Sequence, residues 1–341
     1  MAAKLKDIAE KLNLSAATVS MILNNKGVRI PKETEELVRR TAQELNYHPN
    51  RMAVSLVTKR TMNVALIVPD IQNTFFAELA KYVGDYLKTK QYNLILCSTN
   101  YDVQDDIRLL RMLRAQMVDG IIGVFTGEDP EYTKEIERTL ADKIGIVMMD
   151  KVVSGVTTPY VGTDNFYGGR IAMQHLIENG HRRIAVVTGP MGSVSGQQRL
   201  AGCRAALTDA GLELDESLVF AGDYQYDSGY EAGKAIAKRK DVTAVFVSND
   251  MMAYGVYKAA QEGGRSIGRD LSVVGFDDLR FSSMLEVPLT TIRQPVSEIA
   301  ARAVDILLNN LCSGGTDGGA NGGGGLTPPS LVVRESVCRI G

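Results

Sequence analysis

Nine polar or aromatic residues lie at or just after the ends of segments that resemble buried strands. They are Asn73, Phe75, Phe76, Asp150, Arg199, Tyr224, Asn249, Asp277 and Gln294. Carboxylates accept paired hydrogen bonds from vicinal hydroxyls, arginine and asparagine donate to sugar oxygens, and aromatic rings cover an apolar sugar face. The set therefore predicts a site for a carbohydrate or related polyol. Any single polar member could instead cap a helix, and either phenylalanine could belong to the core.

Short apolar runs alternate with helix-length amphipathic stretches from Met62 onward. The expected strands are Val64–Val68, Asn93–Cys97, Gly120–Phe125, Gly145–Met149, Arg183–Thr188, Leu218–Phe220, Thr243–Val247 and Leu271–Phe276, with helices near 75–89, 104–117, 197–210, 228–239 and 250–262. This alternation is typical of parallel sheets covered by helices on both faces. The two series predict an α/β region of two Rossmann-like lobes, with a ligand cleft between the strand C-termini. The chain is expected to recross between the lobes near Gln294.

Three short helical patterns precede the sheets and predict an all-α headpiece. The inward faces are expected to hold Leu5, Ile8, Ala9 and Leu12, then Val19, Ile22 and Leu23, then Leu37, Val38, Ala42 and Leu45. Ser15 is a good N-cap for the second helix, whose exposed N-terminal surface could enter the major groove of DNA as a helix-turn-helix recognition helix does. The expected DNA-contacting residues are Ser15, Ala16, Ala17, Thr18, Ser20, Met21 and Asn25. A generic three-helix domain is the alternative.

Charge is unevenly distributed along the 341 residues. Residues 1–60 hold eleven lysines and arginines against six aspartates and glutamates, which gives +5, so a chain of net charge −2 leaves −7 for the remainder. A basic module on an acidic body suits a nucleic-acid partner for that module alone.

Several other classes of protein lack support. No phosphate-binding loop or dinucleotide fingerprint occurs, and no cysteine or serine has an evident histidine partner, which argues against an enzyme. The four cysteines have no metal-ligand or disulfide spacing, so we expect no metal, no cofactor and a reducing cytoplasm. No signal peptide or membrane-spanning run is present, which argues against a membrane protein and against a secreted binding protein without a DNA role.

From the first helix to the closing stretch Leu331-Val332-Val333-Arg334-Glu335-Ser336, the sequence resembles the lactose-repressor/galactose-repressor (LacI/GalR) family. The most specific segments are Asp7-Ile8-Ala9, Leu14-Ser15-Ala16-Ala17-Thr18-Val19-Ser20 and the basic linker His48–Leu56. The resemblance implies a headpiece over 1–48, a hinge helix over 49–60 and a periplasmic-binding-protein-like type I effector domain over 61–341. Its N-lobe would span about 61–161 and 293–326, and its C-lobe about 162–292 and 327–341. The glycine-rich stretch Ser313–Thr327 is interpreted as a flexible loop or an insertion without an assigned function.

In that family the linker folds on DNA, and a leucine matching Leu56 wedges into the minor groove. Two departures matter here. Lys4 stands where helix 1 usually begins with a capping threonine, and the base-reading positions Ala16, Ala17 and Met21 sense thymine methyls without bidentate pairing. We therefore expect specificity to depend on the hinge, operator spacing and DNA deformability.

The resemblance implies a cytoplasmic homodimeric transcription regulator, expected to be a repressor, that binds a near-palindromic double-stranded operator. A small effector in the cleft would control its DNA affinity. A sugar is the expected effector, because the cleft residues resemble those of ribose-type periplasmic binding proteins. A purine or another metabolite is the alternative, since one branch of the family binds purines.

Overall fold

The amphipathic patterns of the headpiece form three short helices. These are α1 (Leu5–Leu12), α2 (Ala16–Leu23) and α3 (Lys32–Glu44). Their apolar faces meet in a small core in which Ile8, Val19 and Val38 are fully buried. The expectation that Leu37 is buried is wrong, because its side chain is 38% exposed. Leu37 precedes Val38 by one residue, and one residue rotates a side chain by about 100° around a helix, here away from the inward face.

The computed structural model describes residues 3–23, 30–47, 58, 60–125, 130–149, 156–313 and 325–340. The chain divides into two units, Met1–Thr61 and Met62–Gly341. In the described ranges, no helix is both long and apolar enough to cross a membrane.

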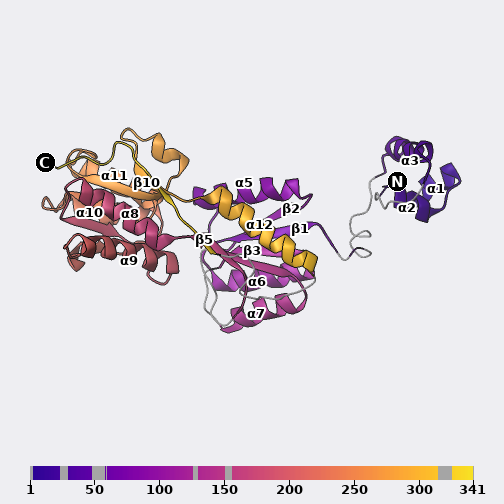
Figure 1. Ribbon diagram of the computed structural model, residues 1–341, viewed down its shortest axis with the longest axis horizontal. Helices are drawn as coiled ribbons and strands as arrows, with labels where there is room; N and C mark the ends of the chain where they lie inside the picture. The colour runs from indigo at the N-terminus through magenta and orange to yellow at the C-terminus, as the bar shows by residue number, and fades with distance from the viewer. Residues whose placement is uncertain are drawn as a thin grey trace. The chain divides into compact units, whose positions relative to one another are not determined.

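The second unit contains two six-stranded sheets, each at the centre of one lobe (Figure 1). The N-lobe sheet has the order β11-β5-β4-β3-β1-β2, and its pairings are parallel. Its strands are β1 (Asn63–Val68), β2 (Asn93–Ser98), β3 (Gly120–Val124), β4 (Gly145–Met149), β5 (Tyr160–Thr163) and β11 (Gly325–Thr327). Continuous apolar runs such as β1 suit such a sheet because both of its faces are covered.

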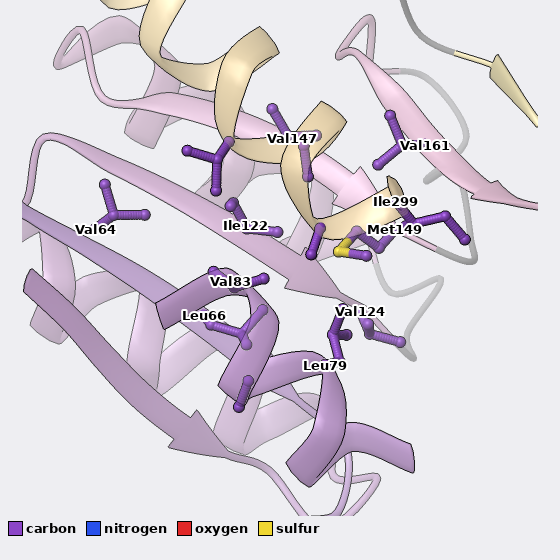
Figure 2. Packing of buried hydrophobic residues seen from close by; sticks show 14 of the residues in the cluster. Val64, Leu66, Leu79, Val83, Ile122, Val124, Val147, Met149, Val161 and Ile299 are labelled. Atoms are coloured by element: carbon purple, nitrogen blue, oxygen red, sulfur yellow. The ribbon is translucent and has the colours of Figure 1, made fainter. Parts of the chain in front are cut away.

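Helices α5 (Thr74–Thr89) and α12 (Val296–Ser313) cover one face of this sheet, and α6 (Val103–Ala115) and α7 (Pro130–Ala141) cover the other (Figure 1). Figure 2 shows Leu79 and Val83 of α5 and Ile299 of α12 against β-strand side chains such as Leu66 and Ile122. Burial of these apolar side chains supplies most of the stabilisation of the lobe.

The C-lobe repeats this arrangement with the sheet order β12-β10-β9-β8-β6-β7. Its strands are β6 (Ile184–Val187), β7 (Val219–Phe220), β8 (Ala244–Val247), β9 (Ser272–Asp277), β10 (Thr290–Arg293) and β12 (Ser330–Val332), the last antiparallel to β10. Helices α8 (Asn165–Glu178) and α9 (Val194–Asp209) cover one face, and α10 (Tyr226–Ala237) and α11 (Asp250–Glu262) cover the other. Two short 3-10 turns, η1 (Glu216–Leu218) and η2 (Arg280–Ser283), complete the lobe.

The chain passes between the lobes three times, so each lobe is built from segments that are not continuous in the sequence. The crossings are β5 to α8, β10 to α12, and β11 to β12. The second crossing contains Gln294, where the sequence predicts that the chain recrosses. Because each crossing is only a few residues long, the lobes are tethered close together but can still rotate about these segments.

The predicted fold class is confirmed, with eight expected strands present within one or two residues of their bounds. The sequence patterns do not predict the helices α7, α8 and α12, nor the short strands β5, β10, β11 and β12. The pair Gly168-Gly169 lowers the helix propensity of α8. In the structure, an added Cβ at Gly169 would lie 2.1 Å from the carbonyl oxygen of Arg199, so the glycine allows α8 and α9 to cross closely. The glycine-rich stretch is also shorter than expected, because α12 extends to Ser313 and β11 begins at Gly325.

Candidate functional site

The predicted recognition helix presents a surface of small side chains. Ser15 Oγ accepts a hydrogen bond from the amide of Thr18 at 3.0 Å and lies 2.8 Å from Thr18 Oγ1, as expected of an N-cap. Ser15, Ala16 and Ala17 are exposed, whereas Val19 of the same helix is buried. The start of α2 is therefore open to a partner.

Thr18, Ser20 and Met21 of α2 are half-buried. The predicted DNA contacts Asn25 and Leu56 lie outside the described residues.

Helix α1 begins without a side-chain cap from Lys4. Instead, Asp7 accepts a hydrogen bond from the Lys4 backbone amide at 2.8 Å, which also places a carboxylate in the first turn of the helix. The usual capping hydroxyl is thus replaced by a carboxylate one turn into the helix, and the Lys4 side chain takes no part in the cap.

A cleft between the two lobes collects most of the predicted effector residues. Its lining consists of Asn73, Phe75 and Phe76 from the N-lobe, Ser195, Arg199, Tyr224, Asn249 and Asp277 from the C-lobe, and Gln294 at a crossing. The cavity between these residues has a volume of about 40 Å³, so in this arrangement of the lobes it is well below the range typical of small-molecule sites. Asp150 lies outside the described residues.

Ser195 lines the cleft but was not predicted from the sequence. Its hydroxyl lies 3.2 Å from the hydroxyl of Tyr224, and its side chain is 2% exposed. Ser195 follows β6 at the start of α9, as Asn73 follows β1 and Asn249 follows β8. Its position after a predicted strand is the signal that could have identified it.

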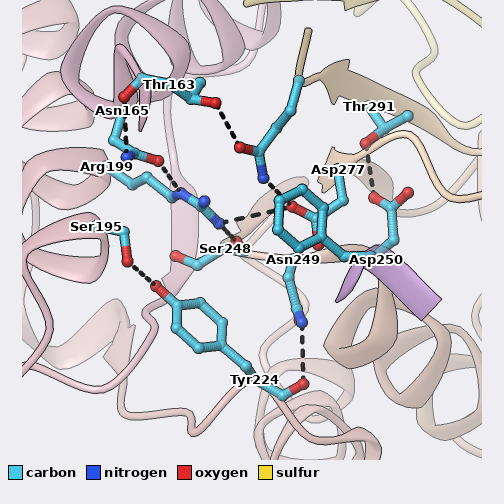
Figure 3. Close-up of polar contacts among 12 residues, drawn as sticks. Thr163, Asn165, Ser195, Arg199, Tyr224, Ser248, Asn249, Asp250, Asp277 and Thr291 are labelled. Carbon is cyan, nitrogen blue, oxygen red and sulfur yellow. Dashed lines mark hydrogen bonds and ion pairs between the residues drawn. The ribbon is translucent and has the colours of Figure 1, made fainter. Parts of the chain in front are cut away.

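Arg199 is held by contacts on several sides (Figure 3). Its Nε donates to Asn165 Oδ1 at 2.8 Å, and its Nη1 donates to the carbonyl of Ser248 and lies 4.0 Å from Asp277 Oδ1. The guanidinium also covers the ring of Phe276. A charge that is only 4% exposed needs such compensation, and these contacts leave the guanidinium little freedom to reorient.

A short chain of hydrogen bonds crosses the lobe boundary. Thr163 Oγ1, at the end of β5, donates to Gln294 Oε1 at 2.5 Å, and Gln294 Nε2 donates to Asp277 Oδ1 at 2.7 Å. These bonds link an N-lobe strand to the C-lobe carboxylate of the cleft. Asp277 is therefore connected through Gln294 to the N-lobe as well as to its own lobe.

Backbone conformation at the cleft is unusual at two residues. Tyr224 has φ 70° and Asp277 has φ 115°, values that non-glycine residues rarely adopt. Such conformations cost roughly 1–3 kcal/mol each and are found mainly where they orient a functional group.

Two asparagines of the cleft also cap helices, so each has a structural role in addition to its position in the cleft lining. Asn73 Oδ1 accepts from the amide of Phe75 at 3.1 Å. Asn249 Oδ1 accepts from the amide of Met252, and its Nδ2 donates to the carbonyl of Tyr224, both at 2.9 Å. Each asparagine is thereby fixed in orientation at the edge of the cleft.

Phe75 and Phe76 differ in burial. Phe76 is 8% exposed and belongs to the N-lobe core, whereas Phe75 is partly buried and packs against that core. Their rings meet edge to face with centroids 5.2 Å apart. Both rings line the cleft, so core packing and an apolar cleft wall are supplied by the same pair.

Comparison with known proteins connects both units to one family. Residues 4–50 match the family of bacterial regulatory proteins, lacI family, and residues 173–337 match the periplasmic binding protein-like domain. The chain is 34% identical to catabolite control protein A of Priestia megaterium, over 88% of this chain and 90% of that protein. It is 33% identical to the ribose operon repressor of Escherichia coli strain K12, over 91% of this chain and 93% of that protein.

A solved structure of the Lac repressor dimer bound to operator and the anti-inducer ONPF has a similar fold. The TM-score is 0.85 at 28% identity, and the match covers 99% of this chain and 100% of that chain. The chain therefore belongs to the lacI family of bacterial regulatory proteins and is a DNA-binding transcription regulator, not an enzyme.

Proposed function

We propose that this regulator is a cytoplasmic homodimeric repressor whose operator affinity is set by a neutral sugar or polyol bound between the lobes. The observation that carries the proposal is the pairing of Arg199 with Asp277 in the cleft, with the guanidinium held over Phe276. A carboxylate beside a guanidinium offers acceptors and donors to vicinal hydroxyl groups, and nearby aromatic rings suit the apolar face of a sugar.

Charge balance in the cleft favours a neutral ligand. Among the described residues that line it, Arg199 is the one cation and Asp277 the one carboxylate. Two nitrogens of Arg199 already donate to protein oxygens, so the cleft offers a phosphate little uncompensated positive charge. Phosphate sites are typically built from several cations or backbone amides. We infer that a sugar phosphate binds far more weakly than the corresponding sugar.

The relatives support sugar control as one of several effector classes in the family. One of them is named for the ribose operon, which makes a pentose the first compound to test. We propose that Asp150, which follows β4 in the sequence, completes the cleft from the N-lobe. A purine remains the alternative effector, and it would stack on the same aromatic rings.

The DNA-binding half of the proposal concerns α2 and the linker. We propose that Ser15, Ala16, Ala17, Thr18, Ser20, Met21 and Asn25 enter the major groove and that Leu56 wedges into the minor groove. Small residues allow close approach of α2 to the base edges. A dimer would place two such helices on the half-sites of a near-palindrome, and the structurally similar Lac repressor is a dimer on its operator.

The proposed dimer has exposed apolar side chains available for burial. Phe281 and Met284 near η2 are 57% and 60% exposed, and Leu96 on the edge strand β2 is 45% exposed. Large apolar side chains that are exposed on each lobe would be buried in an interface between subunits. Sedimentation velocity at micromolar concentration tests the dimer, and a monomer throughout would contradict it.

Effector control would act through the lobe crossings. A sugar that contacts Asp277 and the N-lobe rings favours a closed arrangement of the lobes, and closure moves the N-lobe from which the linker emerges. Coupling of this kind is typically worth about 1–3 kcal/mol and is reciprocal, so operator DNA must change sugar affinity by the same factor.

A thermal-shift screen tests the effector class directly. Pentoses, hexoses, their phosphates, nucleosides and purines are compared with the purified protein and with an Asp277→Asn variant. A neutral sugar at 100 times its Kd should stabilise the native state by about 2.7 kcal/mol. The variant should lose this response. Stabilisation by phosphates or purines alone would reject the neutral-sugar proposal.

An operator selected from randomised DNA then tests the regulatory half. The expected site is a near-palindrome whose binding changes when the identified sugar is added. Equal binding with and without a saturating sugar would reject effector control, even if the sugar binds the cleft.

A further inference from the structure

Asp250, the first residue of α11, is a carboxylate buried behind the cleft. Its side chain is fully inaccessible to solvent. Oδ2 accepts from the amide of Leu279 at 2.9 Å and from Ser282 Oγ at 2.5 Å, while Oδ1 accepts from Thr291 Oγ1 at 2.6 Å. The bond to Thr291 is drawn in Figure 3. One carboxylate therefore joins α11 to β10 and to the turn that follows β9.

The fold provides space for this carboxylate. An added Cβ at Gly275 on β9 would lie 2.2 Å from Asp250 Oδ1, so a larger residue there would displace it. The donors to Asp250 are one backbone amide and two hydroxyls rather than a cation, and burial raises its pKa to about 6. A buried carboxylate without a cation is a poor source of stability, which indicates a positioning role.

The turn that Asp250 holds is strained at its start. Asp277 and Asp278 have φ 115° and 56°, two successive positive values, and Leu279, the next residue, donates its amide to Asp250. Asp278 accepts from Arg293 and Arg334, both at 2.6 Å. Asp250 and these two arginines thus keep the backbone in a conformation that places the Asp277 carboxylate in the cleft.

The other end of the same turn faces solvent. Ser282 is fully buried and lies 2.8 Å from Tyr254 Oη of α11, whereas its neighbour Phe281 and nearby Met284 are among the most exposed apolar side chains of the described chain. Eight consecutive residues, 277–284, therefore connect a cleft carboxylate to an apolar surface, and Asp250 contacts them in the middle.

We propose that Asp250 is a positioning residue that makes the 277–284 turn a rigid connection between the effector cleft and the surface of Phe281 and Met284. A change at Asp277 then alters the environment of that surface. This inference rests on the proposed function for the identity of the cleft, and it adds a route by which cleft occupancy reaches the proposed subunit surface.

The chain has no tryptophan, so Phe281→Trp introduces a single tryptophan into the turn, which is excited at wavelengths where the thirteen tyrosines barely absorb. Four proteins carry this reporter: the parent, Asp250→Asn, Asp277→Asn and the double variant. Acrylamide quenching of the tryptophan and hydrogen exchange at the amide of Leu279 are measured without any effector. Asparagine tolerates positive φ, so Asp277→Asn changes the charge in the cleft with little effect on the backbone.

The proposal expects Asp277→Asn to change the quenching constant in the parent and to have no further effect once Asp250 is asparagine. It also expects Asp250→Asn to speed exchange at Leu279 by about tenfold or more, because a hydrogen bond to a charged acceptor is weakened. Ile236→Val, a cavity in the C-lobe core away from the turn, is the stability control and should leave both readouts near those of the parent.

Three results would overturn the proposal: no change with Asp277→Asn, equal changes in both Asp250 backgrounds, or the same behaviour in Ile236→Val. If Asp250→Asn does not fold, Ser282→Ala removes one of the three donors and must give the same pattern at smaller size. The assay contains no effector, so it tests the role of Asp250 even if the proposed sugar does not bind. If a sugar binds the cleft but the turn fails this test, the proposed function stands and the proposed role of Asp250 is rejected.

Discussion

The guanidinium carbon Cζ of Arg199 lies 3.6 Å from the centroid of the Phe276 ring. A cation–π contact of this kind is worth about 2 kcal/mol when desolvated, and Arg199 is almost completely buried. The ring packs against the guanidinium, and Asn165 Oδ1 and the carbonyl of Ser248 accept hydrogen bonds from its nitrogens. Arginine therefore enters the cleft in one orientation, beside Asp277.

Arg199→Lys should weaken sugar binding more than its retained charge would suggest. Lysine lacks the planar fork that donates to Asn165 and Ser248, and it cannot stack on Phe276 in the same way. We expect the free energy of sugar binding to weaken by about 2 kcal/mol or more. In isothermal titration calorimetry this appears as a Kd at least about 30-fold higher. Arg170→Lys, in an exposed ion pair with Asp209, is the matched control. A Kd within about twofold of wild type for Arg199→Lys would reject this role.

Gly169→Ala should destabilise the C-lobe through the crossing of α8 and α9. The new methyl group would meet the carbonyl of Arg199 at 2.1 Å, and backbone cannot yield as a flexible side chain would. Overpacking typically costs about 1–3 kcal/mol, so urea unfolding should show a loss at or above that range. Gly192→Ala, with open space around its Cβ, should be nearly neutral. Equal unfolding midpoints for the two variants would contradict the close crossing.

The stability of the wild-type protein relative to Asp250→Asn should increase as pH falls. Burial raises the pKa of Asp250 from 3.8 to about 6, so the native state binds the proton more tightly than the unfolded chain. Between pH 6 and 4 this proton stabilises the native state, and above pH 6 the ionised group costs about 3 kcal/mol. Burial lowers the pKa of His181, an effect of opposite sign that is common to both proteins and cancels in the difference.

Urea unfolding of both proteins at pH 7.5 and 5.0 measures this difference. The free energy of unfolding of wild type minus that of the variant should be larger at pH 5.0. A difference that is unchanged or reversed between the two pH values would show that Asp250 is not a buried carboxyl with a raised pKa.

Leu56→Ala should weaken operator binding while sugar affinity stays within about twofold of wild type. The prediction follows from the linker sequence, since Leu56 lies outside the described residues. Loss of an apolar wedge removes contacts that offset the cost of bending DNA, and we expect about 1–3 kcal/mol in a gel-shift titration at fixed salt. Arg51→Ala, a charge change in the same linker, serves as the comparison because its effect should depend more strongly on salt. Equal operator affinity of wild type and Leu56→Ala would remove the wedge from the mechanism.

Much of this protein could be predicted from the sequence because its informative patterns are local. A short apolar run followed by an amphipathic stretch specifies a parallel strand and its helix, and parallel strands bring their C-terminal ends to one edge of a sheet. Residues such as Asn249 and Asp277 could therefore be assigned to a common cleft without coordinates. Ser15 was likewise identified as an N-cap from its place before an apolar helical pattern.

Other features depend on contacts between residues far apart in the chain, which local patterns do not encode. Gly168 and Gly169 weaken a helix locally and are explained only by the helix that crosses them. The contact between the hydroxyls of Ser195 and Tyr224, which follow different strands, exists only in the folded lobe. Asp250 carries no sequence signal of burial, and its three donors come from segments that only the folded sheet brings together. The architecture and most of the cleft residues thus follow from local patterns in the sequence. The hydrogen-bond partners of the buried polar groups depend on tertiary packing, because a hydrogen bond forms only between groups that the fold brings within reach.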